Sequence, residues 1–352
     1  MKSKIFTLVL VLGVFLLSAL TPTRTFAQEK AAKEGEKFDP KPIILEHIGD
    51  SHYWPVNLPL VKEIALPLPV ILYTDKGLEV FSSQVFDHGK TTYLGKNKYQ
   101  LIEDKVKVVD DAGKVNEKAK LYDLSITRNV ASMWLAMAIL LVVFLSVSGK
   151  YKKTVGKAPK GLQSFMEPLV LFVRDDVAIP NIGHKYGKYM PLLLTMFFFI
   201  LISNLLGLVP LFPGGFNLTG NIAVTIVLAG ITLITVNLSG NKYYWKHIFM
   251  PSVPVWLYPL MWVVELAGII SKPFALMIRL FANITAGHIV VLSLISLIFI
   301  FNSLWMSPVS VIFVVFMDTI ELLVAFLQAY IFTMLTALFI GLAVEEHHAD
   351  AH

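Results

Sequence analysis

The stretch SKPFALMIRLFANITAGH, residues 271 to 288, decides how this sequence folds. It is apolar enough to cross a lipid bilayer, yet it carries an arginine, Arg279, near its middle. A charged side chain at the centre of a membrane helix costs about 2.5–3.5 kcal/mol on insertion scales. A partner with a complementary charge has to offset that cost.

The composition is typical of an integral membrane protein. Of the 352 residues, 55% are hydrophobic and only 16% are charged, and the mean hydropathy is +0.66. Several windows of about 20 apolar residues predict an all-α polytopic membrane protein. The net charge of +5 is small and its cations collect in loops, so nucleic acid is not an expected partner. The sequence has no cysteine, which excludes disulfides and thiol chemistry.

The N-terminus has the pattern of an export signal. Lys2 and Lys4 precede the apolar run IFTLVLVLGVFLLSAL, and TFA at 25–27 offers small residues for cleavage. We predict a signal peptide over residues 1–27, with an uncleaved membrane anchor as the alternative.

Residues 28–128 are polar and are expected to form an exported, periplasmic extension. The runs PVILYTDKGLEVF and TTYLGKNKYQLI predict short strands with tight turns, so this small region is expected to be β-rich. His47 and His52, near Glu46 and Asp50, could bind a metal, but their spacing matches no standard site. Ordinary loop packing is preferred, and no metal or other cofactor is expected.

Residues 129–346 are expected to form the membrane domain, with about five helices. The predicted spans are about 130–149, 190–212, 222–240, 254–300 and 305–344. Each of the last two exceeds what a perpendicular helix needs to cross a core about 30 Å thick. These two helices must tilt strongly, break, or both.

The loop at 150–189 sets the expected orientation. Its lysines and arginines outnumber its acids eight to three, an excess typical of a cytoplasmic loop. An exported N-terminal region requires the same orientation, and the tail at 347–352 is then cytoplasmic. We therefore expect a multi-pass protein of a bacterial inner membrane. Within the loop, LQSFMEPLVLFVRDDV predicts an amphipathic helix on the membrane surface or against other spans.

Charged residues inside the predicted spans are concentrated in the last two segments. Glu265, Lys272 and Arg279 are seven apart, and seven residues of an α-helix turn through about 700°, so they share one stripe. Asn283 continues this stripe four residues later. The neighbours of Arg279 on that face are small: Ala275, Ala282 and Ala286. Small residues let another helix approach closely and leave the arginine projecting.

A histidine and two carboxylates form a second group. His288 lies nine residues after Arg279, about 900° of rotation, so a straight helix points it to the opposite side. In the last segment Glu321 and Gln328 are seven apart and share a face, and Asp318 lies one turn before Glu321. A histidine beside a carboxylate in an apolar bundle suits proton exchange, because imidazole titrates near neutrality.

Structural roles are the alternative explanation of these residues. Glu265 lies 14 residues from Arg279, about 21 Å along a straight helix, and cannot pair with it. Glu321 could neutralise Arg279 and lock it in place, and a lone buried histidine is more often structural than functional. The functional interpretation is preferred because several such residues occur together.

Two motifs carry a family resemblance. SKPFALMIRLFANITAGH, followed by LLVAFLQAYIFTMLTALFIGLAVEEH, resembles the signature of subunit a of F-type ATP synthases, over roughly residues 130–346. The resemblance implies a proton-translocating stator subunit with two offset half-channels, which couples proton flow to ring rotation and ATP synthesis. The implied partners are a ring of c subunits, peripheral-stalk subunit b, the rest of the complex and membrane lipid.

The resemblance also implies roles for individual residues. Arg279 corresponds to the essential arginine, which faces the ring and favours the ionised form of a passing carboxylate. The missing counter-charge would then belong to another polypeptide. Gln328 corresponds to a glutamine that steadies the arginine, and Asn283 to a polar residue near it. Glu265 corresponds to a residue lining the inner half-channel.

His288 and Glu321 correspond to the family's outer half-channel pair, and Asp318 joins them on the expected route. Many bacterial members have the acid first and the histidine second, whereas here the order is reversed, as in mitochondrial members. Members often carry an acid just before the third span, where this sequence has only Asn217 and Asn221.

Two other classes of protein are less consistent with the sequence. A secondary transporter would line its own substrate site with these charges, but the internal repeat common in transporters is not found. A membrane scaffold with a binding extension leaves Arg279, His288 and Glu321 unexplained. The sequence has no Gly-rich phosphate loop, so the chain is expected to be non-catalytic, with nucleotide chemistry in other subunits.

Overall fold

The structure is a computed structural model of the whole chain. It describes residues 40–41, 44–45, 49–56, 64–89, 91–102, 104–110, 113–116, 119–153, 156–209, 214–216, 218–250, 253–301 and 305–345. The predicted signal peptide, His47 and the tail at 347–352 lie outside the described residues. The chain divides into two compact units: unit 1 comprises residues 1–135, 206–218 and 285–321, and unit 2 comprises residues 136–205, 219–284 and 322–352.

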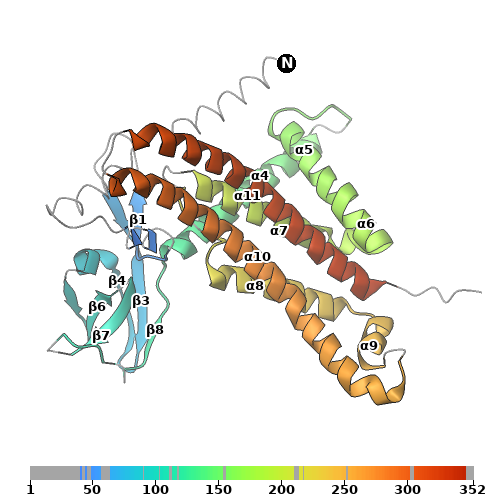
Figure 1. Cartoon of the computed structure of the whole chain (residues 1–352), viewed down its shortest axis with the longest axis horizontal. Helices are drawn as coiled ribbons and strands as arrows, with labels where there is room; N and C mark the ends of the chain where they lie inside the picture. Colours follow the sequence, from blue (N-terminus) through green and yellow to red (C-terminus); the bar gives the residue numbers. More distant parts are fainter. Residues whose placement is uncertain are drawn as a thin grey trace, which may run out of the picture. The chain divides into compact units, whose positions relative to one another are not determined.

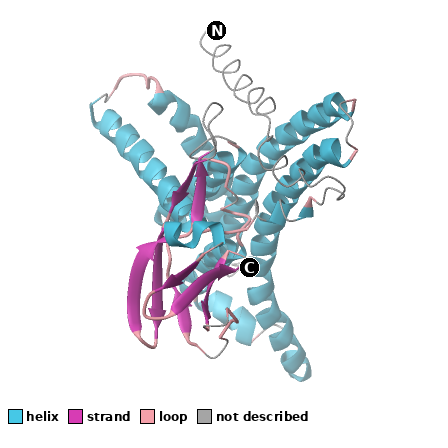
Figure 2. Ribbon diagram, turned by 90° about the vertical axis from the view of Figure 1, so that its left-hand side faces the viewer, coloured by secondary structure: helices cyan, strands magenta, loops and turns pink. Residues whose placement is uncertain are grey.

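The strands of the described chain belong to unit 1 and form three small antiparallel sheets, drawn in magenta in Figure 2. The first sheet pairs β1 (Tyr53–Val56) with β2 (Ile64–Pro67). In the second, β3 (Pro69–Thr74) lies between β4 (Gly77–Ser82) and β8 (Leu121–Asp123). In the third, β6 (Lys98–Ile102) lies between β5 (Thr92–Leu94) and β7 (Lys105–Val109). The prediction of a β-rich N-terminal region is confirmed.

One face of these sheets forms a small core. Along β3 the side chains of Val70 and Leu72 are fully buried, whereas that of the next residue, Tyr73, is exposed. This is the period-2 alternation of a strand. Phe86, from the 3-10 helix η1 (Ser83–Gly89), and Tyr99 of β6 complete the cluster. The extension therefore has a hydrophobic core of its own.

Within the described chain, five helices are long and apolar enough to cross a membrane. They are α4 (Arg128–Lys153), the helical run that ends in α7 (Tyr186–Leu208), α8 (Ile222–Ser239), α10 (Tyr258–Ile300) and α11 (Met306–Val344). A short helix, α9 (Lys242–Phe249), connects α8 to α10. The expected number of spans is thus confirmed (Figure 1).

The last two helices are continuous. α10 has 43 residues and runs through Pro273 without a break, and α11 has 39. At 1.5 Å per residue α10 is about 65 Å long, twice the thickness of a hydrocarbon core. Because neither helix breaks, both must tilt to remain in a bilayer.

The amphipathic segment of the predicted loop packs against other spans. It forms α5 (Leu162–Phe172), a π-helical turn at Val173–Ala178 and α6 (Ile179–Ile182). The ring of Phe172 lies 6.3 Å from that of Phe197 in α7 and 5.4 Å from that of Tyr330 in α11. A Cβ at Gly341 of α11 would overlap the carbonyl oxygen of Asn181 in α6. Only a glycine allows this close approach.

Three segments predicted to be cytoplasmic meet at one end of unit 2. The backbone N–H of Asn241, the N-cap of α9, donates to the carbonyl of Ala343 at 3.0 Å. Its side-chain amide donates to the carbonyl of Glu345 at 2.6 Å. Lys185, just before α7, donates to the carbonyl of Val344 at 3.4 Å. The start of α7, the start of α9 and the end of α11 are thus joined.

Candidate functional site

Arg279 lies on an open face of α10. Its side chain is exposed, as are those of Ala275 and Ala282 one turn before and one turn after it. Among the described residues it has no ion pair or hydrogen bond. The helix that carries it is a candidate membrane span. The described chain supplies no counter-charge for this arginine.

Asn283 and Gln328 join α10 to α11. The side-chain amide of Asn283 donates to Gln328 Oε1 at 2.9 Å, and the side chain of Gln328 is buried. Asn283 lies one turn after Arg279 on α10. Gln328 therefore anchors the helix next to the arginine through Asn283, while a direct contact between Gln328 and Arg279 stays a prediction.

His288 and Glu321 lie next to each other in unit 1. His288 Nε2 is 3.7 Å from Glu321 Oε1, and the two side chains are 12% and 6% exposed. This distance is slightly longer than a hydrogen bond, so a small movement of either side chain allows a proton to pass between them. Asp318, partly buried, lies one turn before Glu321 on the same helix.

Two glycines lie close to this pair. A Cβ at Gly287 of α10 would lie 2.9 Å from Glu321 Cδ. A Cβ at Gly207, at the end of α7, would lie 2.8 Å from the carbonyl oxygen of Phe216 and 3.8 Å from His288 Nε2. Only the contact at Gly287 would force a member of the pair, Glu321, to move; the close contact at Gly207 is with the backbone of Phe216.

Glu265 has a neighbour that the sequence did not indicate. His247 Nδ1, on α9, lies 3.7 Å from Glu265 Oε1, and the side chains are 69% and 26% exposed respectively. Trp262 Nε1 donates to the carbonyl of Phe249 at 2.9 Å and holds the end of α9 against α10; Figure 1 shows the two helices side by side. Burial, and then the charge of Glu265, raise the pKa of Tyr244 on α9.

The three charges of the predicted stripe have different surroundings. Lys272 Nζ lies 5.6 Å from the centre of the Phe339 ring of α11, a cation–π contact. Glu265 faces His247, and Arg279 is exposed. Among the described residues, the arginine is the one of these three charges without an ion pair or a cation–π contact.

Other polar residues in the helices have structural contacts. Thr219 Oγ1 donates to Asn204 Oδ1 at 2.6 Å, and Asn204 Nδ2 donates to the carbonyl of Ala325 at 3.2 Å. Asn204 was not among the residues predicted from the sequence, although an amide inside an apolar run indicates a polar contact within the membrane. Asn221 caps α8, accepting from the N–H of Ala223 at 2.9 Å, and Asn217 lies outside the described residues.

His52, in the extension, has a carboxylate neighbour. His52 Nε2 lies 3.3 Å from Asp123 Oδ2, and the His52 side chain is buried. Burial acts to raise the pKa of Asp123, but hydrogen bonds from His52 and Ser125 outweigh it and the pKa is lowered. Among the described residues no group of three or more His, Asp or Glu could hold a metal ion.

These features define a polytopic helical membrane protein with ionisable side chains inside its last two spans, as in proteins that move ions across a bilayer. A family model described as ATP synthase A chain matches residues 130–341. The ATP synthase subunit a of Chloroherpeton thalassium is 51% identical over 238 residues, which cover 66% of this chain and 71% of that protein. The chain belongs to the ATP synthase A chain family.

Other relatives agree with this membership. The ATP synthase subunit a of Chlorobium phaeobacteroides (strain DSM 266) is 48% identical over 236 residues, 65% of this chain and 68% of that protein. That of Myxococcus xanthus is 47% identical over 238 residues, 65% of this chain and 77% of that protein. The predicted resemblance to subunit a of F-type ATP synthases is confirmed, and the chain is a multi-pass membrane component of the Fo sector that takes part in proton translocation.

The extension matches a family of its own. A model described as a domain of unknown function (DUF8433) covers residues 43–124. This range contains the three sheets and their core. The β-rich region and the membrane region are therefore matched by separate family models.

Proposed function

We propose that this chain is a stator subunit that forms two offset proton half-channels and presents Arg279 to a ring of c subunits. The observation that carries the proposal is the exposed Arg279, on a membrane-span face with alanines on either side of it and without an ion pair among the described residues. A carboxylate on another polypeptide would offset its cost of about 2.5–3.5 kcal/mol. Ala275 and Ala282 leave room for a ring helix to approach.

Arg279 acts as a fixed positive charge in this proposal. A protonated ring carboxylate that comes close to it gives up its proton, because an opposite charge favours the ionised form. The guanidinium keeps its own protons at any physiological pH, so it cannot relay one. It therefore separates the two proton routes. The hydrogen bond between Asn283 and Gln328 holds the adjacent turn of α10 in place.

His288, Glu321 and Asp318 form the outer route. The 3.7 Å approach of His288 and Glu321 supports this assignment, because a buried imidazole beside a carboxylate can accept and release a proton near neutral pH. The proton then passes to a ring carboxylate. No covalent bond to the protein is needed, so the chain is non-catalytic and nucleotide chemistry takes place in other subunits.

Glu265 and His247 form the inner route. On α10, Glu265 precedes Arg279 and His288 follows it, which suits routes that open on opposite sides. Glu265 is mostly buried whereas His247 is largely exposed, so the histidine connects the carboxylate with water. We assign this end to the cytoplasm, together with the C-terminus, and the N-terminal extension to the periplasm of a bacterial inner membrane. The excess of Lys and Arg between α4 and α7 supports this orientation.

The test is ATP-driven proton uptake by vesicles that contain the assembled complex. Arg279→Ala should abolish uptake, whereas Lys272→Ala, seven residues earlier on the same helix, should retain most of it. The c subunits and subunit b of the peripheral stalk should co-purify with both variants, which shows that the complexes are assembled. Unchanged uptake in assembled Arg279→Ala complexes would refute the proposal.

A further inference from the structure

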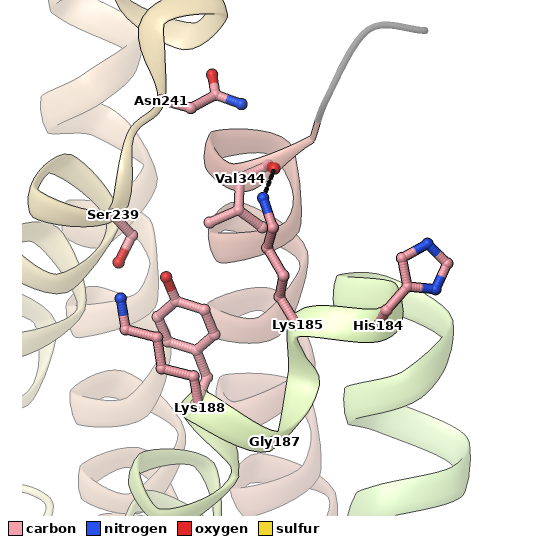
Figure 3. A pocket seen from close by; sticks show the side chains of 8 residues that line it. His184, Lys185, Gly187, Lys188, Ser239, Asn241 and Val344 are labelled. Atoms are coloured by element: carbon pink, nitrogen blue, oxygen red, sulfur yellow. Dashed lines mark hydrogen bonds between the residues drawn. The ribbon is translucent and has the colours of Figure 1, made fainter.

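A pocket of about 510 Å³ opens at the end of unit 2 where α7 begins and where α8 and α11 end (Figure 3). Its lining includes His184, Lys185, Lys188, Ser239 and Asn241. None of its lining residues is acidic, and none belongs to the proton routes proposed above. The pocket is therefore a separate site with its own chemistry.

The polar groups of the pocket include two positively charged donors, Lys185 and Lys188. Lys188 Nζ lies 5.4 Å from the centre of the Tyr189 ring, and Figure 3 shows the side chains of Lys188 and Ser239 pointing toward each other. Lys185 donates to the carbonyl of Val344 at 3.4 Å. The pocket thus offers ammonium, hydroxyl and amide donors together.

We propose that this pocket binds a phosphate group, carried by an anionic phospholipid or present as free phosphate. Phosphate oxygens are strong acceptors, and charge-assisted hydrogen bonds from lysine are stronger than neutral ones. A phosphate here would bridge α7, through Lys188, to the α8–α9 connection, through Ser239 and Asn241.

The position of the pocket suits a phospholipid as the source of the phosphate group. The candidate membrane spans of α8 and α11 end at the pocket, and α7 begins there. Span ends lie at the level of lipid headgroups. Basic pockets between membrane helices on the cytoplasmic side bind anionic headgroups. The orientation of the chain proposed above determines only which leaflet would supply the lipid. Binding of phosphate by the pocket does not depend on that orientation.

The pocket can be monitored with an introduced thiol, because the natural chain has no cysteine. Gly187 lines the pocket and a Cβ there would meet nothing within 4 Å, so Gly187→Cys fits without strain. Gly149, near the end of α4, is equally open and gives a matched control, Gly149→Cys. The rate at which a neutral maleimide labels each thiol is measured in the assembled complex, with proton uptake as the check of assembly.

Three vesicle conditions separate the two sources of phosphate: phosphatidylcholine alone, phosphatidylcholine with phosphatidylglycerol, and phosphatidylcholine with inorganic phosphate. We expect phosphatidylglycerol to slow labelling of the Gly187→Cys thiol several-fold and to leave the Gly149→Cys thiol unchanged. Adding Lys188→Gln should remove this protection. Protection by inorganic phosphate as well would support the site with the free anion as its source. Equal labelling under all three conditions, or protection that survives Lys188→Gln, would overturn the proposal.

Discussion

His288 Nε2 lies 3.7 Å from Glu321 Oε1, and both side chains are almost fully buried. The two residues come from different helices, α10 and α11, and are 33 positions apart in the sequence. Burying an ionisable pair in an apolar environment costs free energy. Such residues are therefore rare inside membranes, and where they occur they often mark ion routes.

Removal of the carboxylate should block the outer route. Glu321→Gln keeps the shape of the side chain but cannot release a proton, so we expect ATP-driven uptake to fall on the order of a hundredfold. The control is Thr319→Ala, an exposed position on the same helix whose hydroxyl only donates to the carbonyl of Val315 at 2.8 Å. His288→Ala should in addition shift the pH dependence of uptake. Equal uptake by Glu321→Gln and the control would argue against a role in proton transfer.

The close packing around the pair makes a sharper prediction. In Gly287→Ala the added methyl group would lie 2.9 Å from Glu321 Cδ and Oε1, so the carboxylate of Glu321 would have to move away from its present position beside His288. Uptake should therefore fall clearly. Gly268→Ala is the matched control, since it makes the same change on the same helix where a Cβ meets nothing within 4 Å. If both variants pump equally well, the pair does not need its present geometry.

The histidine beside Glu265 should affect release of protons rather than their entry. His247→Gln removes the titratable group between Glu265 and water, so ATP synthesis should slow several-fold. Its dependence on cytoplasmic-side pH should also differ from that of the wild type. Tyr244→Phe, on the same short helix, serves as the control because it keeps both His247 and Glu265. A pH profile identical to wild type would exclude His247 from the route.

The extension should lose stability in acid. The pKa of Asp123 is lower in the folded protein than in the unfolded chain, where it is about 3.9. The ionised carboxylate therefore stabilises the fold above about pH 3.9, and this stabilisation is lost as the pH falls through the folded-state pKa. His52→Leu keeps a side chain of similar size but removes the donor that lies 3.3 Å from Asp123 Oδ2 and helps to lower its pKa, so hydrogen exchange in β3 and β8 of the assembled complex should be faster above pH 4. Asp75→Asn, in the exposed turn between β3 and β4, should leave exchange unchanged. Slower or equal exchange in His52→Leu would contradict this account.

The sequence by itself determined the number of the spans, the length of the last two and the identity of the family. Span length follows from local hydrophobicity and the rise of a helix, and neither depends on distant residues. The strands of the extension were also predictable, because alternation and turn residues are local signals. Arg279 stood out for the same reason, since an uncompensated charge in an apolar run is visible without a structure.

The neighbours of these residues were decided only by the tertiary structure. Helical spacing placed Glu265 and Arg279 on one stripe, but His247 reaches Glu265 from a separate helix, α9. The bond between Asn283 and Gln328 likewise depends on how α10 and α11 pack. The basic pocket combines residues as distant as Lys185 and Val344. Side chains far apart in sequence meet only where helix packing brings their backbones together, and that packing depends on every contact between the helices at once.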